Sequence, residues 1–178
     1  MNPHLQSPSP WVLRWASKLR PGSTVLDLAC GHGRHAKLFA GQGHTVLALD
    51  RDADALAQLA GLKGVETLCA DIETERWPLG GRQFDAVIVV NYLHRPLWRS
   101  LVDTVAPGGM LIYETFMQGN ERYGRPSNPD FLLRPAELLE ATRPLEPVAF
   151  EQGVVESRAV VQRICAFKGL AGEFEMPA

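Results

Sequence analysis

Residues 25–34, with the sequence VLDLACGHGR, constrain the fold more than any other stretch of the chain. A short apolar run reaches Asp27 and Leu28, Gly31 and Gly33 follow, and a segment of helical character then begins. Glycine has no Cβ, so it permits a tight turn and a close approach of ligand to backbone. The N–H groups at the start of a helix attract anionic groups. The pattern predicts a strand, a turn and a helix that together bind a nucleotide-like ligand.

Short apolar runs alternate with helical patterns along the rest of the chain. Five runs, of which 86–90 is continuously apolar, read as strands buried on both faces of a parallel sheet. The alternation predicts an α/β fold with helices on both faces of the sheet. The predicted strands span residues 24–28, 45–49, 65–70, 84–90 and 110–113, and two closing strands span 147–155 and 159–167.

Length and composition indicate one domain over residues 1–178. A helical extension is expected within 1–20, starting at Ser9 and Pro10, which suit a helix N-terminus. Residues 117–134 lack periodicity and are predicted to form a substrate loop or lid. Residues 170–178 are expected to be a mobile tail.

Charge and cysteine content limit the expected partners and compartment. The net charge of −2 gives no argument for a nucleic-acid or membrane surface, and the N-terminus does not read as a signal peptide. The three cysteines, Cys30, Cys69 and Cys165, are widely spaced and read as reduced thiols. These features predict a cytoplasmic protein without membrane association and leave the oligomeric state undetermined. RNA and protein substrates remain open, but no basic stripe and no appended binding domain supports them, so a small-molecule substrate is expected.

Polar side chains end each of the first five predicted strands. Ligands of open α/β sheets bind beyond the carboxyl ends of the strands. Carboxylates at four of these five ends suit a ligand with hydroxyls, amines and a positive centre better than a polyphosphate. The residues are Asp27, Asp50, Asp71, Asn91 and Glu114.

These motifs resemble those of the class I S-adenosylmethionine-dependent methyltransferases. Asp27-x-Ala29-x-Gly31-x-Gly33 is similar to their first motif, although Ala29 stands where glycine is commonest. The resemblance covers roughly residues 20–170 and is closest to small single-domain enzymes of the tellurite-resistance-like branch. It implies an enzyme with S-adenosylmethionine as cofactor and a Rossmann-like sheet of seven strands, mostly parallel with an antiparallel edge strand. The other similar segments are Asp50, Asp71-Ile72, residues 84–91 and residues 106–111.

The resemblance also implies a role for each cofactor-binding residue. Asp27 would meet the ammonium group, and the helix after Gly33 the carboxylate, of the methionine part. Asp50 would accept from both ribose hydroxyls, and Asp71 from the adenine amine. Ile72 and Arg51 would flank the adenine ring, while Asn91 and Tyr92 would line the sulfonium. The implied set is Asp27, Ala29, Gly31, Gly33, Asp50, Arg51, Asp71, Ile72, Asn91 and Tyr92.

Two other functions remain open on sequence grounds. Residues 31–36 also fit the G-x-G-x-x-G/A pattern of NAD(P)-binding oxidoreductases, with Asp50 at the expected distance. The acid before the turn and the acid ending the third strand argue against this function. A non-catalytic S-adenosylmethionine-binding subunit is the second alternative, which the long polar and aromatic loop disfavours.

No metal is expected, and the catalytic residues are the least constrained part of the site. Cys30, His32 and His35 have side chains that would diverge across the turn. The identity of the methyl acceptor is open, and a hydroxyl or amine acceptor requires a base. The candidates follow strands four and five or lie in the loop, and they are His94, Tyr92, Glu114 and Tyr123; Arg122, Arg125 and Arg134 are candidates to meet an anionic substrate.

Overall fold

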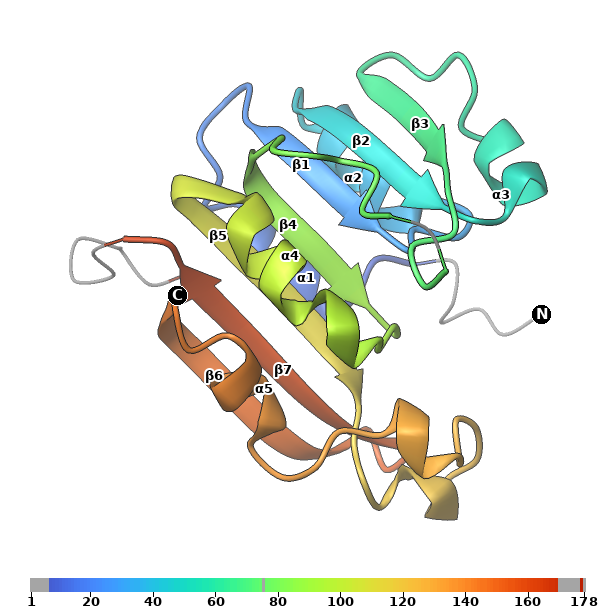
Figure 1. Ribbon diagram of the computed structural model, residues 1–178, viewed down its shortest axis with the longest axis vertical. Helices are drawn as coiled ribbons and strands as arrows, with labels where there is room; N and C mark the ends of the chain where they lie inside the picture. The colour runs from blue at the N-terminus through green and yellow to red at the C-terminus, as the bar shows by residue number, and fades with distance from the viewer. Residues whose placement is uncertain (1–6, 75, 170–176, 178) are drawn as a thin grey trace.

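The chain forms a seven-stranded sheet in the order β3-β2-β1-β4-β5-β7-β6 (Figure 1). The computed structural model describes residues 7–74, 76–169 and 177, so the tail predicted at 170–178 lies outside the described residues except for position 177. The strands are β1 (Thr24–Leu28), β2 (Thr45–Asp50), β3 (Val65–Cys69), β4 (Phe84–Val90), β5 (Val105–Phe116), β6 (Glu146–Val155) and β7 (Ala159–Phe167).

The predicted α/β fold class is confirmed, because β1 to β5 pair in parallel and helices cover both faces of the sheet. The reversed strand is β7, which is antiparallel to β5 on one side and to β6 on the other. β6 therefore occupies the edge of the sheet. The two closing strands form a hairpin, as their proximity in the sequence predicted.

Two helical layers enclose the sheet (Figure 1). Side chains of α1 (Pro10–Ala16), α2 (Arg34–Gly41) and α3 (Ala53–Ala57) pack with one face of the sheet in one core. Side chains of α4 (Trp98–Thr104) and α5 (Glu137–Ala141) pack on the other face in a second core. The central strands β1 and β4 are buried on both faces, which explains why their sequences are mainly apolar.

The structure gives the bounds of two predicted elements. The helical extension expected within residues 1–20 is the helix α1, which ends at Ala16. β5 begins at Val105 and ends at Phe116, beyond both predicted bounds of 110 and 113, and its first residues pair with β4 through an irregularity between Phe84 and Ala86. A Cβ at Gly109 would lie 2.9 Å from the carbonyl oxygens of Ala106 and Asp85, so only glycine fits this bulge.

Gly33 supplies a stability prediction, because it begins α2 directly against the side chain of Leu59. Its φ is +68°, and a Cβ would lie 2.5 Å from Leu59 Cδ1 in the core. Gly33→Ala therefore combines left-handed strain with overpacking, and we expect it to lower the free energy of unfolding by about 2–5 kcal/mol. Urea denaturation followed by circular dichroism measures this loss.

Gly31→Ala is the matched control, because Gly31 has a φ of +52° but a Cβ there would meet no atom of the described residues within 4 Å, its chain neighbours aside. It should lose only the left-handed strain, about 1–2 kcal/mol. Equal losses in the two variants would contradict the packing of Leu59 against the start of α2.

Candidate active site

The carboxyl ends of β1, β2, β4 and β5 lie along one side of the sheet, the side to which their arrowheads point in Figure 1. Leu28, at the end of β1, is paired with Leu49 of β2 and Val89 of β4. The residues that follow these positions therefore emerge side by side. The shared edge brings together the glycine turn, Asp50 and Asn91.

The turn after β1 is wound by alternate residues in the left-handed region. Ala29, Gly31 and Gly33 have φ values of +52°, +52° and +68°. The N–H of Cys30 donates to the carbonyl of Leu49, 3.1 Å away, which fastens the turn to β2. Ala29 adopts this conformation at a cost of roughly 1–2 kcal/mol, which explains why glycine suits the position.

Asp50 is the acid best placed to bind a ligand. Its carboxylate accepts from the N–H of Gly31 at 2.7 Å and from the N–H of Asp52 at 2.9 Å. An ionised carboxylate has about four lone-pair sites, so two remain for hydroxyl groups of a ligand. The half-buried side chain is thus fixed by the backbone while it still has acceptor capacity.

Space for a cofactor exists beside this carboxylate. Chain neighbours aside, no atom of the described residues lies within 4 Å of the position that a Cβ on Gly31 would take, so the turn has an open side. Asp71 is partly exposed, with one oxygen accepting from the N–H of Glu73 at 3.0 Å, and Arg51 is exposed. Ile72 is only 7% exposed and packs into the core, which leaves little of it for an adenine ring. An open turn beside a carboxylate with spare lone pairs fits the ribose and methionine parts of S-adenosylmethionine.

Asp27 has a structural bond that the sequence did not reveal. It is 2% exposed, and its Oδ2 accepts from the N–H of Ala36 at 2.8 Å, in the first turn of α2. Burial raises the pKa of Asp27 to about 7. The carboxylate therefore ties β1 to α2, and its contact with an ammonium group stays a prediction.

His35 and Ser9 form a buried connection that sequence reasoning missed. Burial lowers the pKa of His35 to about 3, so the ring is neutral and its Nε2 accepts from the N–H of Ser9 at 3.1 Å. The Ser9 hydroxyl donates to Oε1 of Glu114 at 2.9 Å, and Arg34 Nη1 donates to the Ser7 carbonyl at 3.1 Å. Ser9 was recognisable as a helix cap, but its partners are distant in sequence. The connection holds residues 7–9 beside the glycine turn.

Glu114 and His94, two of the proposed catalytic residues, lie outside the hollow beyond β4 and β5. Glu114 binds Ser9 through one carboxylate oxygen, and the other lies 3.5 Å from Arg163 Nη1, which favours a bracing role over that of a base. His94 is half-buried before the 3₁₀ turn η2 (Arg95–Leu97), and its side chain makes no capping bond there. Neither residue lines the hollow described next.

A hollow opens beyond β4 and β5, next to the cofactor edge. It comprises two adjoining spaces of about 520 and 220 Å³ that share four lining residues. We refer to it as the acceptor hollow. It is lined by Glu73, Asn91, Tyr92, Leu93, Thr115, Phe116, Arg125, Pro126, Ser127, Asn128 and Phe131.

Tyr92 is the proposed catalytic residue that the structure places in the acceptor hollow. Burial, together with the carboxylates of Glu73 and Asp71, raises the pKa of its hydroxyl far above the ordinary value. It therefore stays protonated and is a poor base, and its hydroxyl oxygen is buried without a hydrogen-bond partner among the described residues. Tyr123 is 43% exposed and does not line the hollow.

The segment 117–134, predicted as a loop or lid, is a braced platform. It contains the 3₁₀ turns η3 (Asn120–Arg122) and η4 (Pro129–Phe131). The buried Asn120 donates to the carbonyl of Pro126 at 3.0 Å and accepts from the N–H of Val160 at 3.1 Å. Gln162, also buried, donates to the carbonyl of Arg134.

Glu137 is the second brace of this platform. It is 1% exposed and accepts from Arg95 Nε at 2.8 Å and from the N–H of Arg134 at 2.7 Å. Burial acts to raise the pKa of Glu137, but the hydrogen bonds from Arg95 and Arg134 outweigh it and lower the pKa. Arg134 is thus engaged within the fold and Arg122 donates to the carbonyl of Gly119, so Arg125 alone of the three loop arginines lines the hollow.

Among residues 7–74, 76–169 and 177, no three His, Cys, Asp or Glu side chains gather as metal ligands would. No helix in the same ranges has the length and apolar character needed to cross a membrane.

Strand order 3-2-1-4-5-7-6, with a glycine turn after β1 and an acid ending β2, defines the class I methyltransferase fold. Residues 25–109 match the family model described as "Methyltransferase domain". The match covers just under half of the chain and shows a methyltransferase domain, an enzyme domain whose cofactor is S-adenosylmethionine. The predicted class and cofactor are confirmed, and the NAD(P)-binding alternative is set aside.

Solved structures share this fold at low sequence identity. TehB from Haemophilus influenzae has a TM-score of 0.74 and 18% identity, over 90% of this chain and 62% of that protein. A SAM-dependent methyltransferase from Methanosarcina mazei has a TM-score of 0.70 and 17% identity, over 92% and 99% of the two chains. These likenesses concern the fold.

Curated relatives correct the predicted partner. A tRNA U34 carboxymethyltransferase of Klebsiella pneumoniae is 34% identical over 56% of this chain and 33% of its own length. The probable tRNA methyltransferase 9B of Bos taurus is 30% identical over 64% of this chain and 26% of its own. The matched part thus spans about a third or less of these relatives. Their names contradict the small-molecule partner that we expected because the sequence shows no basic stripe and no appended binding domain. Neither feature is needed for a local binding site.

We refer to the glycine turn of residues 29–33 together with Asp50 as the cofactor cradle. The variant Asp50→Ala tests whether this cradle binds the cofactor. The carboxylate would contribute two charge-assisted hydrogen bonds to a diol, so we expect affinity for S-adenosylhomocysteine to fall about 100-fold or more. Isothermal titration calorimetry measures the change. Asp52→Ala is the control, because Asp52 only caps α3 through the N–H of Ala55, and its loss should lower stability by about 1 kcal/mol without weakening binding. Unchanged affinity in Asp50→Ala would refute the assignment.

His35 and Asp27 give opposite pH dependences. Because the pKa of His35 is lowered to about 3, its contribution to stability is lost as pH falls from about 6.5 towards 3. Because the pKa of Asp27 is raised to about 7, its contribution is lost as pH rises from about 4 to 7. Between about pH 4 and 6.5, a fall in pH therefore lowers the stability contributed by His35 and raises the stability contributed by Asp27.

The variant His35→Gln removes the pH dependence of stability that comes from His35. We expect the difference in unfolding free energy between wild type and His35→Gln to shrink as pH falls from 7 to 4.5, by at most about 1.4 kcal/mol per pH unit. Urea titrations at several pH values measure it. A difference that stays constant would show that His35 is not buried in its neutral form.

Proposed function

We propose that the protein transfers the methyl group of S-adenosylmethionine to a nucleotide of tRNA. The observation that carries this proposal is the position of Asn91, which directly follows β4 next to the cofactor cradle and lines the acceptor hollow. The proposal is supported by the family match and by the two relatives whose names specify tRNA. The proposed acceptor class also agrees with the cytoplasmic location predicted from the cysteines.

Some residues of the site would bind the cofactor, and others would orient the acceptor. When bound, S-adenosylmethionine supplies an activated methyl group. In-line displacement at such a group depends mainly on the placement of the acceptor. Asp50 and Asp71 would hold the ribose and adenine, while Asn91 and Tyr92 would line the boundary with the acceptor. Asn91 is well suited to this place, since its φ of +58° turns the chain out of β4 while its N–H donates to the Glu114 carbonyl.

Proton transfer, where the acceptor atom requires it, would involve Glu73 in place of His94 or Glu114. Glu73 lines the acceptor hollow, is exposed and lies beside the Tyr92 hydroxyl. An exposed carboxylate can accept a proton from a substrate N–H or O–H.

Transfer of label from methyl-tritiated S-adenosylmethionine to bulk tRNA tests the proposed reaction. We expect ribonuclease-sensitive incorporation, with the methylated nucleoside identified by mass spectrometry after digestion. Asp50→Ala should reduce incorporation at least about 100-fold, whereas Asp52→Ala should retain it.

Two outcomes would overturn the proposal. Binding of S-adenosylhomocysteine without label in tRNA would support the remaining alternative, a cofactor-binding protein that does not methylate tRNA. Label that is resistant to ribonuclease and sensitive to protease would indicate a protein acceptor.

A further inference from the structure

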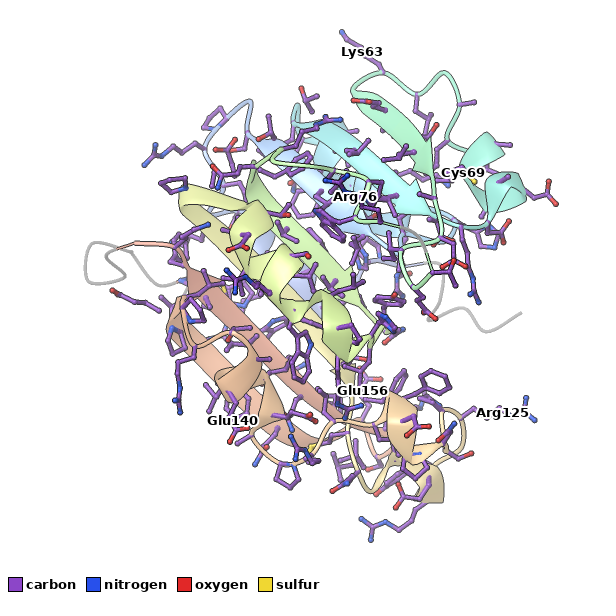
Figure 2. The ribbon with its side chains drawn as sticks, viewed as in Figure 1. Lys63, Cys69, Arg76, Arg125, Glu140 and Glu156 are labelled. Carbon is purple, nitrogen blue, oxygen red and sulfur yellow. The ribbon has the colours of Figure 1, made fainter. Side chains whose placement is uncertain are left out.

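Phe131 and Arg125 are the exposed aromatic ring and the cation of the acceptor hollow. Phe131 is 51% exposed in the turn η4. Arg125 is exposed as well, and Figure 2 shows its side chain extended away from the body of the protein. Both residues lie on the braced segment 117–134, outside the motifs that form the cofactor cradle.

The backbone around Phe131 is held on both sides. Arg95 Nη1 donates to the carbonyl of Asp130 at 2.8 Å, and its Nη2 donates to the carbonyl of Leu132 at 2.9 Å. The same guanidinium binds the buried carboxylate of Glu137. An exposed ring is thus presented by a turn that is fixed from within the fold. Such pre-organisation lowers the entropic cost of binding a flat ligand.

Arg125 places a positive charge beside Phe131 at the acceptor hollow. Within the described ranges, no ion pair or hydrogen bond involves its guanidinium, in contrast to Arg95, Arg122 and Arg134. A guanidinium binds a phosphate through two parallel hydrogen bonds. Asn91 and Asn128, which also line the hollow, carry amides that can bond to the edge of a nucleobase.

We propose that the acceptor hollow binds one unpaired nucleotide of the RNA substrate, with its base stacked on Phe131 and an adjoining phosphate bound by Arg125. This inference rests on the proposed function and specifies how that substrate is recognised. Stacking on aromatic side chains with local phosphate contacts is the usual chemistry of single-stranded RNA recognition. It also reconciles an RNA substrate with a net charge of −2, because one base and one phosphate require no basic stripe.

Stacking on Phe131 is tested by the affinity for a fluorescein-labelled single-stranded RNA of about 12 nucleotides, measured by fluorescence anisotropy. We expect Phe131→Ala to weaken binding about 5- to 100-fold, in the range of a lost base–aromatic stack. Phe131→Trp should restore it. Leu13→Ala is the matched control, since Leu13 is a similarly exposed apolar residue on α1, and it should bind as wild type does. A duplex of the same length should bind more weakly than the single strand.

The phosphate contact is tested by the salt dependence of the same binding. One phosphate contributes a slope of about −0.7 in a plot of log affinity against log salt concentration. Arg125→Ala should reduce the slope by about that amount. Arg99→Ala, at an exposed arginine that pairs with Asp103 on α4, should leave it unchanged.

Failure of this inference is distinguishable from failure of the proposed function. Methylation of tRNA by wild type with equal RNA affinity in Phe131→Ala would overturn the stacking and leave the function standing. Preference for the duplex would overturn it as well. Absence of RNA binding and of methyl transfer to tRNA in wild type would overturn both. In each variant, unchanged S-adenosylhomocysteine affinity shows that the cofactor site is intact.

Discussion

The register of β1 between β2 and β4 is the constraint on which the site depends. Pairing of Leu28 with both Leu49 and Val89 brings three chain segments to the same level as they leave the sheet. Parallel strands buried on both faces cannot shift this register without disrupting both cores. The bonds from Cys30 N–H to Leu49 and from Gly31 N–H to Asp50 then fix the turn. The cofactor cradle is therefore a direct consequence of strand pairing.

The acceptor side is built by a different means. Its backbone is irregular, and buried polar groups hold it: Asn120, Glu137 and Gln162 are each at most 1% exposed and each bonds to main-chain groups of the segment or its flanks. A buried carboxylate such as Glu137 is costly unless it is fully paired, and two arginines pair it here. Such a network contributes a defined position more than stability. The exposed ring of Phe131 is held in place by interactions of this kind.

The prediction of a small-molecule partner was wrong for a physical reason. Net charge predicts non-specific, long-range attraction, whereas recognition of a single nucleotide needs one ring and one cation in the right place. The sequence showed Arg122, Arg125 and Arg134 as equivalent candidates. Only the folded chain distinguishes them, because two of the three are engaged within the fold.

The sequence by itself determined the sheet, the glycine turn and the acids at the strand ends. These follow from local patterns, namely buried apolar runs, glycines that take a positive φ and polar residues where strands stop, and β1 and β4 have the predicted bounds. Tertiary structure decided what each polar group is free to do. Asp27 is bonded to α2, Glu114 to Ser9, and His35 to a residue 26 positions away, while Asp50 keeps acceptor capacity. Partners so distant in sequence leave no local pattern, so the roles of these side chains emerged only when the chain was folded.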